Sequence, residues 1–336
     1  MDKEPRKMSR VLVTGATGFL GRYLVERLLE DGVFVKVFIR DRQKAQWLLN
    51  EGAEVVVGNL TDTQTILPAL VGVDTVFHCA ALVHQTDSLE GTFESVNVQG
   101  TTHLTEACLD NGGVERFVHV SSLGVLGPVP LGKRANEQAE PLPRDPYGRS
   151  KLAAEQVVLK ACERGLACTI ARPEWIYGVR APSTIRVFRM ATRGALILVG
   201  RATALHQPIW VDDVVEGLIR CAICRKAKNR SYHLAGAEAM TVARELQLVA
   251  EAVGGSMPRL HIPTRIALVL AGACDTLFPA VGRKSPFGVR HVEFFRTNRA
   301  YSIDRAREDL GWAPVVDFES GAREAARELR IMGQLS

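Results

Sequence analysis

The sequence lacks the long hydrophobic run that a membrane-spanning helix requires. Such a helix needs ~18 or more consecutive apolar residues, and the nearest candidate, 266–273, is short and stands between Arg265 and Asp275. A secretory signal peptide is missing as well, because the first ten residues lead directly into a strand pattern. We therefore expect no spanning segment and a cytoplasmic protein.

Cysteine is too scattered for a disulfide framework. The chain has seven cysteines, an odd number, and eight histidines without ligand-like clustering. Cys221 and Cys224 form a C-x-x-C pair, but they lie in an apparently helical run, and no second pair stands at zinc spacing. These absences argue against a metal site and indicate a reducing compartment.

The sequence also lacks a strong excess of charge of either sign. Its 42 basic and 37 acidic residues leave a net charge of +5, and the basic residues are scattered rather than gathered in a stripe that would bind nucleic acid. We therefore expect no nucleic-acid partner. With 46% hydrophobic and 24% charged residues among 336, the composition is that of a globular protein with one large domain or two closely joined ones.

Strand and helix patterns alternate along the first half of the chain. Apolar runs at 11–13, 33–39, 54–57, 75–79 and 117–120 indicate buried strands, and 19–30 has the apolar spacing of a helix. This rhythm predicts an α/β fold with a doubly wound parallel sheet. After Arg172 the alternation of strand and helix patterns becomes irregular. A further β-α unit follows at 209–224, with a last strand at 232–234.

A glycine-rich loop joins the first strand pattern to the first helix pattern. Gly15, Gly18 and Gly21 have the spacing G-x-x-G-x-x-G. Glycines permit a tight turn and let backbone amides approach a pyrophosphate, and the following helix N-terminus adds partial positive charge. The loop therefore predicts a dinucleotide site.

Tyr147 and Lys151 are four residues apart, so on a helix they share one face. A free phenol has a pKa near ~10 and is a poor acid or base at neutral pH. A neighbouring ammonium is expected to lower that pKa, which suits general acid–base work. Upstream, Ser121 and Ser122 end an apolar run and offer a hydroxyl that can orient a substrate oxygen. Together with the glycine loop, this pattern predicts hydride transfer coupled to proton transfer.

Over nearly its whole length the chain resembles the extended short-chain dehydrogenases/reductases of the NAD-dependent epimerase/dehydratase superfamily. The matching segments, in the family's order, are 14–21, 78–81, 97–101, 120–122, the Tyr147/Lys151 pair, 172–178, 210–214 and 310–312. Segments 120–128 and 262–281 also look like the 3β-hydroxysteroid dehydrogenase branch.

The resemblance implies a Rossmann domain and a smaller C-terminal substrate-binding domain. We place the Rossmann domain at 8–172, with a returning β-α unit near 207–236, and the smaller domain at 173–206 and 237–330.

The resemblance also implies roles for individual residues. Ser122, Tyr147 and Lys151 are the expected catalytic residues, and Ser122 is chosen because the family's catalytic serine lies five residues before a glycine, here Gly127. Asn97 matches a helix position that braces the site. The residues expected to bind the cofactor are Gly15, Thr17, Gly18, Phe19, Leu20, Gly21, Arg40, Asn59, Leu60, Ala80, Ala81, Tyr147, Lys151 and Pro173.

Arg40 and Asp41, at the end of the second strand pattern, bear on the choice of cofactor. An arginine there accommodates the 2′-phosphate of NADP, whereas an acid binds the ribose hydroxyls of NAD. Because Arg40 comes first, we expect NADP, with NAD left open by Asp41. Asn59 departs from the aspartate that the family usually has at the adenine edge.

The predicted substrate is a small molecule on a largely apolar, sterol- or terpenoid-like skeleton that carries a secondary alcohol or ketone. Trp175 stands where nucleotide-sugar enzymes have a diphosphate-binding Asn, and 206–209 lacks their Arg. A nucleotide-sugar epimerase or dehydratase is the alternative. A non-catalytic NADP-sensing regulator is disfavoured, because Tyr147 and Lys151 are both present. The resemblance leaves peripheral membrane contact and a homodimer open.

Overall fold

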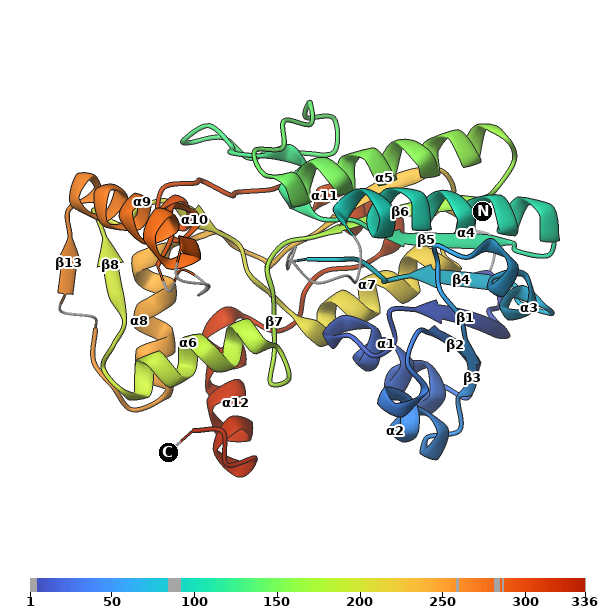
Figure 1. Ribbon diagram of the computed structural model, residues 1–336, viewed down its shortest axis with the longest axis horizontal. Coiled ribbons are helices and arrows are strands. Elements are labelled where there is room, and N and C mark those ends of the chain that lie inside the picture. The colour runs from blue at the N-terminus through green and yellow to red at the C-terminus, as the bar shows by residue number, and fades with distance from the viewer. Residues whose placement is uncertain (1–4, 84–91, 258–259, 281–284, 286, 336) are drawn as a thin grey trace.

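A seven-stranded parallel sheet forms the centre of the larger part of the molecule (Figure 1). The structure is a computed structural model that describes residues 5–83, 92–257, 260–280, 285 and 287–335. The strand order is β11-β6-β5-β4-β1-β2-β3, and all six pairs are parallel. The strands are β1 (Arg10–Thr14), β2 (Phe34–Ile39), β3 (Glu54–Val57), β4 (Thr75–His78), β5 (Arg116–Val120), β6 (Cys168–Pro173) and β11 (Arg230–Leu234).

Helices cover both faces of this sheet, which confirms the predicted doubly wound Rossmann fold. One face carries α1 (Phe19–Glu30) and α7 (Val211–Ile223), which pack together. The other carries α3 (Leu67–Leu70), α4 (Gly100–Asn111) and α5 (Pro146–Glu163), as Figure 1 shows. Strands β4, β5 and β6 are buried throughout, as expected for parallel strands that helices cover on both faces. The short helix α2 (Gln46–Asn50) follows β2.

A second, smaller set of elements lies beside the sheet, at the left of Figure 1. Its core joins α6, α8 and α12 around Phe188, Val249 and Ala325. The elements are α6 (Pro182–Thr192), α8 (Val242–Ala252), α9 (Thr264–Ala280), α10 (Val289–Phe294), α12 (Phe318–Ile331) and the parallel pair β8 (Ile197–Val199) and β13 (Leu260–Ile262). The predicted apolar segment 262–281 is described up to residue 280, because residue 281 lies outside the described residues.

Short pairs of strands connect the two parts. They are β7 (Ile176–Tyr177) with β10 (Ile209–Trp210), and β9 (Leu205–His206) with β12 (Met240–Thr241). The helix α11 (Asp304–Leu310) packs against β11, although its residues fall in the range expected for the smaller domain. The chain therefore passes between the two parts several times. The division at 173–206 and 237–330 stays a prediction.

The cysteines behave as packing residues. All seven are free thiols, and Cys221 is buried in α7 while Cys224 follows the end of that helix. Within the described residues, no group of three or more His, Cys, Asp or Glu side chains is arranged to hold a metal ion. Across the same part of the chain, no helix combines the length and apolar character needed to cross a membrane.

Candidate active site

The helix α5 presents Tyr147 and Lys151 toward the carboxyl end of the sheet. The helix begins at Pro146, and Asp145 caps it by accepting a hydrogen bond from the Gly148 amide at 2.7 Å. Proline is well suited to the first helical position and aspartate to the cap. Lys151 is buried against the sheet with 1% of its surface exposed, and its Nζ donates to the Val120 carbonyl at 2.7 Å.

Ser122 and Tyr147 come together at this site. The Ser122 hydroxyl lies beside the Tyr147 phenol and acts to lower its pKa, and the Ser122 Oγ accepts a hydrogen bond from the Gly124 amide at 3.1 Å. Ser121 is buried, and its hydroxyl finds no hydrogen-bond partner within the described part of the chain. The geometry therefore joins the serine chosen from the sequence, and not its neighbour, to the tyrosine.

The expectation that Lys151 lowers the pKa of Tyr147 is wrong for this structure. Burial raises the pKa of Tyr147 to about 12, the Asp145 carboxylate adds to the rise, and the nearby Ser122 hydroxyl opposes it. The Lys151 ammonium donates to the Val120 carbonyl, and burial of the phenol outweighs any lowering of its pKa by that charge. Burial lowers the pKa of Lys151 itself to about 8, while Glu155 and Cys79 act in the opposite direction.

The glycine loop after β1 is built for close approach. Gly15 has φ +73°, and a Cβ there would lie 2.6 Å from the Ala80 amide nitrogen. A Cβ on Gly21 would lie 2.2 Å from the Gly15 carbonyl oxygen. Gly18 is the N-cap of α1 and has no side chain to accept from the first amides. Those amides and the helix dipole fit a pyrophosphate, so the residues present suit a dinucleotide.

Arg40 and Asp41, at the end of β2, differ in their hydrogen bonds and ion pairs. Arg40 is exposed and forms no hydrogen bond or ion pair with any described residue. The Asp41 carboxylate accepts from the Gln43 amide at 2.9 Å and lies 3.7 Å from the Lys44 ammonium. At the end of β3, the Asn59 side-chain oxygen accepts a hydrogen bond from the Thr61 amide at 3.2 Å. Arg40 is therefore the freest of these polar groups.

Asn97 ties three parts of the site together. Its Oδ1 accepts from the Leu82 amide at 2.7 Å, and its Nδ2 donates to the Leu82 carbonyl at 3.0 Å and to the Ser150 Oγ at 2.9 Å. Asn97 is 1% exposed and lies in a π-helical turn, Glu94–Gln99, that leads into α4. Turns of this kind occur often at functional sites. The side chain thus braces the segment after β4 against α5.

Aromatic rings lie where the two parts of the molecule meet. The ring centroids of Trp175 and Phe294 are 6.4 Å apart in an edge contact, and those of Phe294 and His206 are 4.4 Å apart. His206 is buried and fully engaged, with Nδ1 3.1 Å from the Glu245 carboxylate and Nε2 3.0 Å from the Phe294 carbonyl. It is therefore a packing residue rather than a free donor for a diphosphate.

Two buried acids were missed by the sequence reasoning. Glu155 pairs with Arg172 beneath α5. Glu174 is 8% exposed, its Oε1 lacks a hydrogen-bond partner among the described residues, and its nearest cation is Arg299 at 3.8 Å. Burial raises the pKa of Glu174. The spacing of Glu155, four residues after Lys151, was a signal available in the sequence.

Comparisons with known proteins identify the family of the chain. The family described as "NAD dependent epimerase/dehydratase family" matches residues 11–235. The human protein "Sterol-4-alpha-carboxylate 3-dehydrogenase, decarboxylating" is 29% identical over 96% of this chain and 88% of its own. The "3 beta-hydroxysteroid dehydrogenase/Delta 5-->4-isomerase" of Mycobacterium tuberculosis is 30% identical over 95% and 90%. The crystal structure of UDP-glucose 4-epimerase from Thermus thermophilus, in complex with NAD, has a TM-score of 0.74 at 26% identity, covering 96% of this chain and 99% of that one.

Proposed function

The chain belongs to the NAD-dependent epimerase/dehydratase family, in a branch similar to the 3β-hydroxysteroid dehydrogenases, and we propose that Ser122, Tyr147 and Lys151 are its catalytic residues. The protein is an NAD(P)-dependent oxidoreductase that transfers a hydride between nicotinamide and a secondary alcohol or ketone on a largely apolar substrate. The proximity of the Ser122 hydroxyl to the Tyr147 phenol, one helical turn from Lys151, is the observation that carries these roles.

The chemistry follows from the positions of these three side chains. When bound, the nicotinamide supplies or accepts the hydride. Tyr147 gives a proton to the substrate oxygen during ketone reduction and takes it back from the alcohol in the reverse direction. Ser122 donates a hydrogen bond to the same oxygen and orients it. The Lys151 ammonium, whose pKa is about 8, offsets negative charge as the phenol loses its proton.

The preferred cofactor in this proposal is NADP. Arg40 is exposed at the end of β2, and the described residues offer it no partner. The Asp41 carboxylate, in contrast, already caps the following turn. A free guanidinium at this place suits a 2′-phosphate, and NAD remains the alternative cofactor.

A sterol- or terpenoid-like substrate is the proposed class. Two observations support it: the relatives named for sterol and hydroxysteroid chemistry, and the aromatic contact between Trp175 and Phe294 between the two parts of the molecule. The engagement of His206 with Glu245 argues further against a diphosphate site there.

Location and assembly also belong to the proposal. Ile266, Val269, Leu270 and Leu277 are exposed apolar residues of α9 at roughly helical spacing, which supports peripheral contact with a membrane. Seven free thiols support a reducing cytoplasm. A homodimer is proposed on the family resemblance alone. Vesicle co-sedimentation of a Val269→Glu variant and analytical ultracentrifugation test the first and the last point.

Substitutions at the two serines and the tyrosine test the catalytic roles. We expect Tyr147→Phe to lower kcat/KM by about 100-fold to 10,000-fold, the usual contribution of general acid–base catalysis, while NADPH still binds. Ser122→Ala should lower the rate as well. Ser121→Ala is the matched control and should leave the rate unchanged, because that hydroxyl is buried apart from the phenol. Wild-type turnover in Tyr147→Phe would end this assignment.

A further inference from the structure

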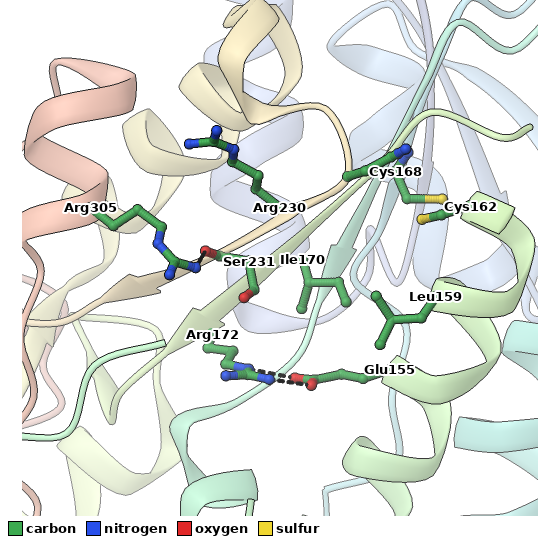
Figure 2. A pocket seen from close by; sticks show the side chains of 10 residues that line it. Glu155, Leu159, Cys162, Cys168, Ile170, Arg172, Arg230, Ser231 and Arg305 are labelled. Atoms are coloured by element: carbon green, nitrogen blue, oxygen red, sulfur yellow. Dashed lines mark hydrogen bonds and ion pairs between the residues drawn. The ribbon is translucent and has the colours of Figure 1, made fainter. Parts of the chain in front are cut away.

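A buried ion pair lies directly behind Lys151. Glu155 follows Lys151 by one helical turn on α5, and each residue is only 1% exposed. Arg172, on β6, grips the Glu155 carboxylate with two hydrogen bonds, Nε to Oε1 at 2.9 Å and Nη2 to Oε2 at 2.6 Å (Figure 2). A two-pronged contact of this kind fixes the position of the carboxylate as well as its charge.

The other titratable groups around Lys151 carry no compensating charge near neutral pH. His78 and Cys79 face it from β4 and the residue that follows, and His119 faces it from β5. Burial lowers the pKa of His78 to about 3 and that of His119 well below its ordinary value, and burial raises the pKa of Cys79 to about 12. On α5, burial likewise keeps Tyr147 protonated.

The hydrogen bonds of His78 agree with its neutral form. Its Nε2 lies 2.9 Å from the Thr101 hydroxyl, which itself donates to the Asn97 carbonyl at 2.6 Å, so Nε2 must be the donor. Its Nδ1 then accepts from the Thr14 hydroxyl at 2.8 Å. Among these neighbours, Glu155 is the group that brings a negative charge toward the Lys151 ammonium.

We propose that Glu155, held in place by Arg172, is a positioning residue that keeps Lys151 charged for the reaction. The inference rests on the catalytic role proposed above for Lys151. Burial lowers the pKa of Lys151 to about 8, and Glu155 is the first of the two groups that oppose this fall. Without Glu155 the lysine loses its proton at a lower pH, and a neutral amine cannot offset the charge of a phenolate.

The pair also lines a pocket at the surface. A pocket of about 410 Å³ opens beside the C-terminal half of α5, and Glu155, Arg172, Ser231 and Arg305 line it (Figure 2). Removal of the Glu155 side chain therefore leaves space beside a guanidinium at the wall of an open pocket. A small carboxylate from solution can enter that space and replace the missing group.

The test is the pH dependence of NADPH affinity and of kcat/KM in Glu155→Gln. We expect both to decline with rising pH about one pH unit earlier than in the wild type, as the loss of one adjacent opposite charge implies. At pH 8 this reduces the charged fraction of Lys151 from one half to about one tenth, a roughly fivefold loss. Glu163→Gln is the matched control, because Glu163 is exposed on the same helix, and its profile should match the wild type.

Further variants separate charge from structural support. Arg172→Gln removes the cation that neutralises the Glu155 carboxylate and keeps that carboxylate one turn from Lys151, so its alkaline decline should not move to lower pH. If the ion pair only supports the structure, Glu155→Gln and Arg172→Gln should cause the same loss of activity. Neither should then move the alkaline decline to another pH. In Glu155→Ala, formate at constant ionic strength should restore activity and the alkaline midpoint, whereas chloride should not.

The results that overturn the inference are distinct from failure of the catalytic proposal. An unchanged alkaline midpoint in folded Glu155→Gln, with Tyr147→Phe inactive, refutes the role of Glu155 alone. If Glu155→Gln does not fold, a downward shift in Arg172→Gln equally refutes it. Wild-type turnover in Tyr147→Phe instead refutes the proposed catalytic residues.

Discussion

Two glycines with the same backbone conformation allow the cofactor loop to be tested against a matched control. Gly15 and Gly32 both have φ +73°. An alanine in this left-handed region costs roughly 1–2 kcal/mol. A Cβ at Gly32 meets nothing within 4 Å, whereas a Cβ at Gly15 would lie 2.6 Å from the Ala80 nitrogen and 2.7 Å from the Cys79 carbonyl carbon. Both contacts at Gly15 involve backbone, so the loop must move.

The two alanine variants should therefore lose similar amounts of unfolding free energy from backbone strain, but they should differ in their affinity for the cofactor. Gly32→Ala should lower the free energy of unfolding by about 1–2 kcal/mol and leave NADPH affinity unchanged. Gly15→Ala should incur the same strain and also shift the amides that face the pyrophosphate. A loss of at least about 1.4 kcal/mol of binding energy, or tenfold in Kd, follows.

Urea unfolding and fluorescence titration with NADPH measure these two quantities separately. The reasoning fails if Gly15→Ala binds NADPH as tightly as the wild type. It fails equally if Gly32→Ala loses as much cofactor affinity as Gly15→Ala, because the backbone strain alone would then explain the result.

Three further substitutions test other parts of the account. Arg40→Ala should weaken NADP binding about tenfold and leave NAD binding unchanged, since a charge-assisted hydrogen bond is lost; equal NADP affinity in titrations of both proteins would remove Arg40 from the site. Asn97→Ala should cost about 1–3 kcal/mol of unfolding free energy, because it leaves the Leu82 backbone groups unpaired, and wild-type stability in urea would contradict the bracing role. Trp175→Asn should lower kcat/KM for an apolar alcohol; an unchanged value would show that the indole does not contact the substrate.

Much of the fold followed from local patterns in the sequence. The first strand pattern at 11–13 appears as β1, and the glycine loop lies between β1 and α1 as expected, because both features depend on neighbouring residues. Ser122, chosen over Ser121 from the sequence, is the serine whose hydroxyl lies beside Tyr147, and its catalytic role stays a prediction.

The electrostatics of the site depended on contacts that are distant in the sequence. The Lys151 ammonium binds a carbonyl of β5, and burial by the rest of the fold raises the pKa of Tyr147 to about 12. Glu155 and Arg172 meet across 17 positions of the chain. Helical spacing alone shows which side chains share a face, but it cannot show how deeply that face is buried or what it packs against.

The most direct measurement of the central claim is a turnover assay that follows nicotinamide absorbance with 3β-hydroxysteroids and, in parallel, with UDP- and dTDP-sugars. We expect a net change in cofactor absorbance with at least one steroid or related apolar alcohol, in wild type and not in Tyr147→Phe. Conversion of a nucleotide sugar without net cofactor change, with all the steroids inert, would contradict the account and favour an epimerase or dehydratase.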